Sequence, residues 1–315
     1  MIAMRKMCLA VAGLFYFVVL SAMADDFVVL GDMPYGDDKT TLTRYSALLE
    51  KINDERLSFV VHVGDVKSGS SECSDESFEM QRAFFARLDH PLIYTPGDNE
   101  WTDCHRITNG GYDPLERLTR LRDVFFDEPY FRATTNINLI SQGLISDSFP
   151  EFVENQIWSV GDSLFVAVHI VGSNNNISAT SKEGKVEYER RLNADIAWLE
   201  KAFSQLKHER FSSLVIFFHA DPFADWMTQY PSRLNTGFER IIGNTLIPLA
   251  RSTQKPVLIV HGDTHVFRWD SPMRWEGRSL SNVSRVVVPG AKDMRALRIS
   301  KPTGRHQAHH IEIFE

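Results

Sequence analysis

Residues 57–70 read LSFVVHVGDVKSGS, an apolar run that stops at Gly64-Asp65 and opens into small, polar residues. A run of this length that is rich in Val and Phe is typical of a buried strand. It carries one carboxylate, Asp65, at its carboxyl end, and that edge of a parallel sheet is where α/β proteins usually hold ligands. Asp65 is therefore the first candidate for a functional residue.

Four other predicted strands end in the same way, because an acid or a histidine follows each apolar run within a few residues. Segments with helical spacing separate them, and the alternation of strand and helix predicts an α/β protein whose parallel sheet is covered by helices. The predicted strands are 27–30, 91–95, 213–218 and 256–260, which precede Asp32, Asp98, His219 and Asp263, and the predicted helices are 42–52, 76–88, 113–126, 185–206 and 236–251.

The remaining segments follow from the same patterns. Residues 156–160 and 163–171 predict a hairpin with a tight turn. Residues 127–155 are polar and aperiodic, which is typical of an insertion or lid. Three short strands close the chain, at 284–288, 296–300 and 310–314.

The first residues predict a secretory signal. Arg5 and Lys6 precede an apolar run, and the small residues 21–24, Ser-Ala-Met-Ala, follow it. The alternative is an uncleaved anchor, since residues 7–24 nearly reach the ~20 apolar residues that a membrane span needs. The Ala-x-Ala ending favours cleavage after Ala24, so we expect a signal peptide at 1–24, one domain at 25–315, no stable membrane span and a periplasmic or secreted protein.

Charge excludes one class of partner. The chain has 34 basic and 41 acidic residues, and loss of Arg5 and Lys6 leaves 32 basic residues, a formal charge of −9. Such a surface repels nucleic acid, and no basic stripe interrupts it. We therefore expect no nucleic-acid-binding surface.

Two cysteines remain once Cys8 leaves with the signal. Cys73 follows the Asp65 loop and Cys104 follows the next loop with an acid at its strand end. In an oxidising compartment pairing is the default, although two free thiols are the alternative. A disulfide between them would hold both loops in place.

The five strand ends suggest metal chemistry only when they are taken together. A single Asp before a turn is ordinarily a cap for that turn. Carboxylates mixed with imidazoles suit first-row ions such as zinc, manganese or iron. A pair of such ions activates water and stabilises both the attacking and the leaving oxygen of a displacement at phosphorus.

The order of the polar segments resembles the motifs of the calcineurin-like metallophosphoesterases, as an exported member of bacterial type. The segments are GD at 31–32, GDVKSG at 64–69, PGDNE at 96–100, FFHADP at 217–222 and HGDTH at 261–265. The resemblance covers residues 27 to about 270 and implies a four-layer αββα sandwich. It also implies hydrolysis of a phosphate mono- or diester in a small phosphorylated substrate, through two divalent or trivalent ions (Mn, Fe, Zn or similar) and a metal-bound hydroxide.

The resemblance also implies a ligand set. Asp32 would bind the first metal, Asp65 would bridge both, His219 would bind the second, and His265 would return to the first. Asp263 stands where the family has the first His of its GHxH segment. His261 is a rival, two residues back on the same face of the strand, and we favour Asp263.

Three family positions differ in this chain. Pro34 replaces the His of the D-x-H motif and cannot bind metal. The family's GNH becomes Gly97-Asp98-Asn99, so either Asp98 or Asn99 is the ligand, and we favour Asn99 because a neutral amide better tolerates an anionic phosphate. Ser68 stands where a GD-x-x-Y pattern would place a tyrosine ligand, which disfavours a purple iron site of that pattern.

Whether Asp98 or Asn99 takes the place of the asparagine in the family's GNH segment, the histidine of that segment is absent. The resemblance implies that this histidine is the family's usual proton donor. The replacements are His105, Glu100 and His62, and we take His105 together with Asn99 as the catalytic residues. Arg268 is a candidate for contact with phosphate oxygens. The competing hypothesis is a degenerate member that keeps the fold as a binding or scaffold protein of the cell envelope, without turnover.

Overall fold

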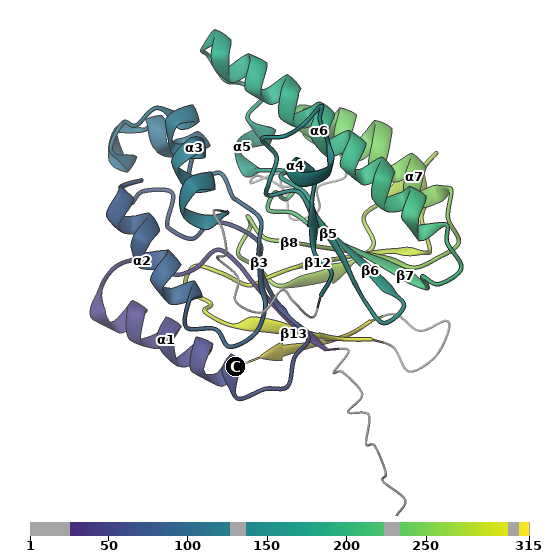
Figure 1. The fold of residues 1–315 in the computed structure, drawn as a ribbon, viewed down its shortest axis with the longest axis horizontal. Helices are drawn as coiled ribbons and strands as arrows, with labels where there is room; N and C mark the ends of the chain where they lie inside the picture. The colour runs from purple at the N-terminus through teal and green to yellow at the C-terminus, as the bar shows by residue number, and fades with distance from the viewer. Residues whose placement is uncertain (1–25, 127–136, 224–233, 302–308, 315) are drawn as a thin grey trace, which may run out of the picture.

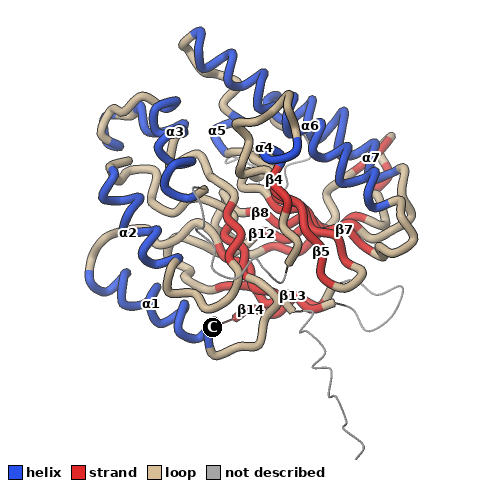
Figure 2. The backbone as a smooth tube through the Cα atoms, in the orientation of Figure 1, coloured by secondary structure: helices blue, strands red, loops and turns tan. Residues whose placement is uncertain are grey.

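The structure, a computed structural model, describes residues 26–126, 137–223, 234–301 and 309–314. Two sheets lie face to face at its centre (Figures 1 and 2). The predicted signal peptide and part of the predicted insertion fall outside the described residues. Within the described ranges, no helix is both long and apolar enough to cross a bilayer.

The first sheet has five strands in the order β14-β13-β1-β2-β3. The first three strands of the chain pair in parallel, so their carboxyl ends meet at one edge, whereas β13 and β14 are antiparallel additions. The strands are β1 (Phe27–Leu30), β2 (Val60–His62), β3 (Leu92–Tyr94), β13 (Ala296–Ser300) and β14 (His310–Phe314).

The second sheet has seven strands in the order β4-β5-β6-β7-β8-β12-β9. Its hairpin β5–β6 is antiparallel, as predicted, and β6, β7, β8 and β12 run parallel. The strands are β4 (Ile140–Ser141), β5 (Gln156–Val160), β6 (Ser163–Ala167), β7 (Ser213–Phe217), β8 (Val257–His261), β9 (Arg268–Asp270) and β12 (Val283–Val287), while β10 (Arg274–Trp275) and β11 (Arg278–Ser279) form a separate pair.

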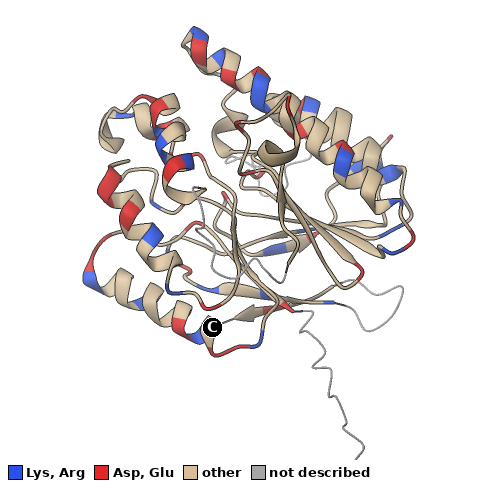
Figure 3. Ribbon diagram, in the orientation of Figure 1, with Lys and Arg blue, Asp and Glu red and all other residues tan. Residues whose placement is uncertain are grey.

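Helices cover the outer faces of both sheets, with α1, α2 and α3 on one side and α6 and α7 on the other (Figure 1). Acidic and basic residues are interspersed along these helices (Figure 3). The helices are α1 (Lys39–Asn53), α2 (Asp75–Phe85), α3 (Pro114–Phe125), α4 (Gln142–Ile145), α5 (Gly172–Asn175), α6 (Lys182–Leu206), α7 (Ile247–Arg251), η1 (Thr102–His105), η2 (Ile107–Asn109), η4 (Thr236–Phe238) and η5 (Glu239–Leu246).

The alternation of side chains along each strand creates the layers. Val28 and Leu30 of β1 pack against the helices α1–α3, whereas Phe27 and Val29 point between the two sheets. The second sheet does the same: its inner face meets Phe27 and its outer face packs on α6 and η5. The predicted four-layer αββα sandwich is therefore confirmed.

The predicted helix 236–251 is the element that differs most. It divides into the 3₁₀ turn η4, the π-helix η5 and the short α7. Pro248 explains part of the change, because proline lacks the N–H that an α-helix needs and its ring crowds the carbonyl four residues back. The short strands β4, β9, β10 and β11 were not predicted, because none of them contains the apolar run that marks a strand in the sequence.

The predicted disulfide is present. Cys73 and Cys104 are bonded, are fully buried and have Cα atoms 5.7 Å apart, within the usual range for a disulfide. The bond joins the loop that follows β2 to η1, which follows β3, across 31 residues. Both loops carry candidate site residues.

We expect replacement of both cysteines by serine to lower the free energy of unfolding by about 3 to 4 kcal/mol, because the unfolded chain regains the entropy of an open loop. Urea denaturation of the two proteins, with and without reductant, measures the difference. Reductant should destabilise the parent and leave the double variant unchanged; equal stability of all four samples would contradict a structural role for the bond.

Candidate metal centre

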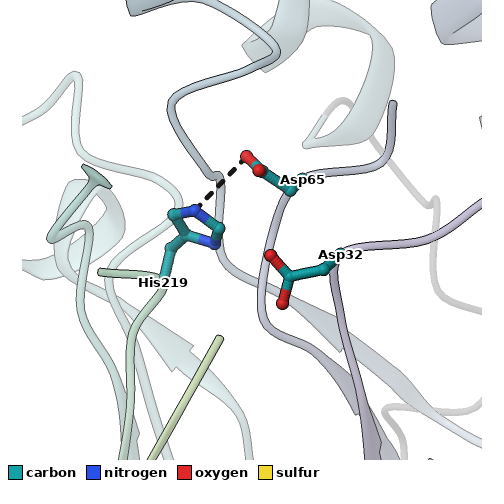
Figure 4. A group of neighbouring side chains, drawn as sticks. All are labelled: Asp32, Asp65 and His219. Atoms are coloured by element: carbon teal, nitrogen blue, oxygen red, sulfur yellow. Dashed lines mark ion pairs between the residues drawn. The ribbon is translucent and has the colours of Figure 1, made fainter. Parts of the chain in front are cut away.

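The carboxyl ends of β1, β2, β3, β7 and β8 meet at one edge, and their acids and histidines converge there. Asp32, Asp65 and His219 lie together, each offering one ligand atom within 4.8 Å of the others (Figure 4). Asp98, His219 and Asp263 form a second group by the same measure. His219 is common to the two groups, so they lie side by side.

The backbone at this edge is strained in a way that directs the side chains inward. Asp32, Asp65, Asp263 and His265 all have left-handed φ angles, of 54°, 55°, 77° and 62°. Such angles are uncommon for residues other than glycine, and they concentrate at functional sites. Gly97 allows the closest approach, since a Cβ atom there would overlap the Asp65 carboxylate.

Direct contacts fix the imidazoles. The ring of His219 lies with Nδ1 2.8 Å from the Val63 carbonyl, and its Nε2 is 3.1 Å from Asp98 Oδ1 and 3.3 Å from Asp65 Oδ1. His265 Nε2 lies 3.4 Å from Asp32 Oδ1. The two histidines therefore face different carboxylates across the site.

The electrostatics of the site fit a cation. Asp32, Asp65 and Asp98 are buried, and among the described residues they form ion pairs only with histidines. Burial raises the pKa of Asp65 well above its usual value, although His219 opposes the shift. Burial and the charge of Asp98 raise the pKa of Asp263 to about 7. A cation would offset this concentration of buried negative charge.

Burial and the neighbouring carboxylates have opposite effects on the pKa of His219. Burial alone would lower the pKa of His219, but Asp65 and the hydrogen bond with Asp98 raise it well above its usual value. Carboxylates with imidazoles are also the donor set that first-row ions prefer. These side chains can therefore hold zinc, manganese or iron.

No family model matches the chain, and no curated protein matches it by sequence. Solved structures do match. A dimetal phosphatase from Danio rerio superposes with a TM-score of 0.54 at 13% identity, over 92% of this chain and 99% of that one. This protein has the calcineurin-like metallophosphoesterase fold. PhoD matches with a TM-score of 0.53 at 12% identity, over 91% of this chain and 68% of that one.

The purple acid phosphatase PPD1 from yellow lupin matches the same fold, with a TM-score of 0.50 at 12% identity over 87% of this chain and 49% of that one. The metallophosphoesterase fold predicted from the motifs is thus confirmed at identities too low to be found by sequence comparison. Dimetal phosphatases share it, and this chain carries candidate ligand groups.

Two alternatives that the sequence left open can now be compared with the geometry. Asp98 joins the second ligand group, whereas the Asn99 amide nitrogen faces Asp65 Oδ2 as a hydrogen-bond donor. Asp98 is therefore the better placed ligand, and ligation by Asn99 remains a prediction. Asp263 also belongs to that group, while His261 is buried, stacks on Phe218 and joins neither group.

The three candidate proton donors lie elsewhere. His105 is exposed, with Nδ1 2.7 Å from the Thr102 carbonyl, and it lines a neighbouring cavity instead of the one at the metal groups. His62 is fully buried, and burial lowers its pKa to about 4. Neither histidine belongs to the ligand groups. Glu100 instead accepts hydrogen bonds from two loops of the site.

Glu100 connects the two central loops. Its Oε1 accepts hydrogen bonds from the backbone N–H groups of Asp65 (2.9 Å) and Gly97 (2.8 Å) and from the Tyr94 hydroxyl (2.7 Å). The side chain is fully buried. It therefore fixes the Asp65 loop relative to the loop that carries Asp98.

A cavity of about 680 Å³ opens over the ligand groups. Arg106 lines it and pairs with Asp103 at 2.7 Å, so a guanidinium is available at its wall. Arg268, the predicted phosphate contact, lies on β9 and is not among the lining residues. The other lining side chains include Tyr35, Asp65, Asp98, Asn99, Ser173, Asn174, Asp221, Asn235, Phe238, Asp263 and His265.

A left-handed turn forms one wall of this cavity. Residues 173–176 have φ angles between 49° and 56°, an unusual run of four. The Ser173 hydroxyl donates to Asp98 Oδ2 (2.8 Å) and contacts Asp103 Oδ1 (3.0 Å), which orients the Asp98 carboxylate. Arg191 of α6 supports the turn by donating to Asn175 Oδ1 (2.6 Å).

Tyr35 is the site residue that sequence reasoning missed. Its hydroxyl donates to Asp65 Oδ2 (2.6 Å) and lies 3.2 Å from His265 Nε2. Burial and the charges of Asp65 and Asp32 raise its pKa. The sole signal in the sequence was its place three residues after Asp32.

We expect Glu100→Ala to lower the free energy of unfolding by about 2 to 4 kcal/mol, because three buried donors lose a charged acceptor. Glu100→Gln keeps an acceptor oxygen and should lose less than half as much. Guanidinium denaturation measures both, with the exposed Glu72→Ala as control. If Glu100→Ala is no less stable than that control, Glu100 does not hold the loops.

Proposed function

We propose that this protein is an exported, metal-dependent phosphoesterase that hydrolyses a mono- or diester of phosphate in a small substrate, with two metal ions. The observation that carries the proposal is the pair of carboxylate and imidazole groups that share His219 beneath a cavity. The metallophosphoesterase fold, shared with a dimetal phosphatase, supports it.

The roles of the protein groups follow from their positions. Asp32 and His265 would hold the first ion, and Asp98, His219 and Asp263 the second. Asp65, which groups with both Asp32 and His219, would bridge the two. Two bound ions supply an activated water and neutralise charge on the phosphoryl oxygens. Ser173 keeps the Asp98 carboxylate in one orientation.

Side chains at the cavity wall would recognise the phosphoryl group. Arg106 offers a planar set of donors suited to phosphate oxygens, and its partner Asp103 limits the directions it can take. The Asn99 amide lies beside Asp65 and donates to it. Its nitrogen also contacts the Tyr35 hydroxyl and the Lys67 carbonyl, so it would stabilise charge on the phosphoryl oxygens by exchanging one of these contacts for the substrate.

None of the three candidate proton donors lies where it could protonate the leaving group. His62, Glu100 and His105 do not line the cavity over the metal groups. Without a proton donor, an enzyme favours leaving groups that are stable as anions. We therefore propose activated esters or anhydrides as better substrates than simple alkyl phosphates.

Export is proposed from two features. The basic, apolar and small-residue order of residues 1–24 predicts a signal peptide. The buried Cys73–Cys104 disulfide supports it, because such bonds persist in oxidising compartments.

Asp65→Asn should reduce hydrolysis of nitrophenyl phosphates by roughly a hundredfold or more, because a neutral amide removes a charge from the ligand groups. Metal analysis and turnover are measured after loading with zinc, manganese or iron, with the exposed Asp147→Asn as control. A parent protein that binds these metals but shows no turnover above Asp65→Asn would favour the scaffold hypothesis; a parent that binds none would reject the metal centre.

Arg106→Ala should lower kcat/KM for a phosphate ester by roughly tenfold, mainly through KM, because a charged contact with the phosphoryl group is lost. The control is Arg82→Ala, which removes an exposed arginine from α2, away from the cavity. Steady-state kinetics compare the three proteins. Equal values for Arg106→Ala and the control would show that this guanidinium does not contact substrate.

A further inference from the structure

We propose that a second cavity, beside the one over the metal groups, binds a polyhydroxylated part of the substrate, such as glycerol or a sugar. Its volume of about 550 Å³ is within the usual range for small-molecule sites. The loop 102–106, the start of α3 and the segment 173–184 line it. The inference rests on the proposed function and names the class of its substrate.

The second cavity shares a wall with the cavity over the metal groups. Asp103, Arg106 and Ser173 line both. The Ser173 hydroxyl lies 2.8 Å from Asp98 Oδ2 and 3.0 Å from Asp103 Oδ1. Arg106 in turn pairs with Asp103 at 2.7 Å. A continuous row of contacts therefore leads from a candidate metal ligand to the second cavity, and a phosphoryl group bound at the metal groups would have its substituent within reach of that cavity.

Both donors and acceptors line the second cavity. The hydroxyls of Ser178 and Thr180 and the carboxylate of Glu183 form no hydrogen bond or ion pair with other described residues, so they are available to a ligand. His105 adds an acceptor. Its Nδ1 lies 2.7 Å from the Thr102 carbonyl, which can only accept, so the neutral ring carries its proton on Nδ1 and accepts at Nε2. A polyol matches this mixture, because each of its hydroxyls both donates and accepts.

Other classes of ligand match these side chains less well. Nucleobases and quaternary ammonium groups bind preferentially against aromatic rings, and no aromatic side chain of the described residues lines this cavity. A second anionic group would meet the carboxylates of Asp113 and Glu183. A primary ammonium offers donors alone, and it would meet the like charge of Arg106.

The proposal concerns the part of the substrate that is recognised, which need not be the leaving group. In an anhydride or an activated diester, the polyol stays on the phosphorus atom while another group departs. The preference for activated leaving groups is therefore compatible with a polyol in the second cavity.

The experiment measures binding with phosphonates, because their phosphorus–carbon bond is not hydrolysed. Calorimetric titration of the zinc-loaded, full mature chain compares dihydroxybutylphosphonate with butylphosphonate, and glucosylmethylphosphonate with cyclohexylmethylphosphonate. The first pair tests glycerol and the second a sugar. We expect the hydroxylated member of at least one pair to bind roughly tenfold more tightly than its partner, since it adds one or more hydrogen bonds. Aminoethylphosphonate tests the ammonium class.

Two variants assign this preference to the second cavity. Ser178→Trp should fill the cavity and Glu183→Ala should remove an acceptor, and both positions are exposed, so the fold should be retained. Ser204→Trp and Glu200→Ala are the matched controls, at exposed positions of α6 outside the cavity. We expect the preference for hydroxylated phosphonates to fall roughly tenfold in Ser178→Trp, to fall by less in Glu183→Ala, and to persist in both controls.

The inference is overturned if the parent binds no phosphonate, or if neither hydroxylated member binds more tightly than its partner. It is also overturned if aminoethylphosphonate binds at least as tightly as the hydroxylated phosphonates, or if the preference survives in both cavity variants. Turnover of nitrophenyl phosphate is measured separately. Turnover without a preference for hydroxylated phosphonates refutes the second cavity alone, whereas the preference without turnover supports the cavity and refutes the proposed function alone.

Discussion

The burial of several carboxylates at one edge of two sheets is the constraint on which the rest of this structure depends. Asp32, Asp65 and Asp98 would repel one another in the absence of opposite charge. The disulfide and the hydrogen bonds to Glu100 hold the loops in place, although the charge of Glu100 adds to the repulsion, and the imidazole of His219 offsets it. Such support for a ligand shell is what a metal centre requires.

The sequence was informative wherever one physical rule governed many residues. The alternation of strands and helices, with apolar runs that end in acids, predicted a parallel sheet covered by helices and the convergence of Asp32, Asp65, His219 and Asp263. The four layers with two sheets were predicted from the resemblance of the polar segments to a known family. Parallel pairing makes this possible, because it brings strand ends that are distant in the chain to one edge. The pairing of Cys73 and Cys104 followed from composition in the same way.

Other parts depended on the path of individual loops, which no periodicity encodes. Adjacent residues in a loop point in different directions, so the sequence could not decide between Asp98 and Asn99. Tyr35 enters the site because its loop turns back over Asp65, and His105 stays outside because η1 carries it away. The division of the helix 236–251 needed the local effect of Pro248 to outweigh helical spacing.

The left-handed turn at residues 173–176 explains why this polar stretch consists of serine and asparagine. Among residues with a Cβ atom, asparagine tolerates the left-handed conformation best. The run Ser-Asn-Asn-Asn therefore fits the left-handed backbone of the turn. Within it, Ser173 alone contacts a candidate metal ligand, Asp98. Valine or isoleucine would clash with the backbone in this conformation, even at positions that touch no substrate. The effects of mutations along residues 173–176 would therefore reflect backbone conformation more than contact with a substrate.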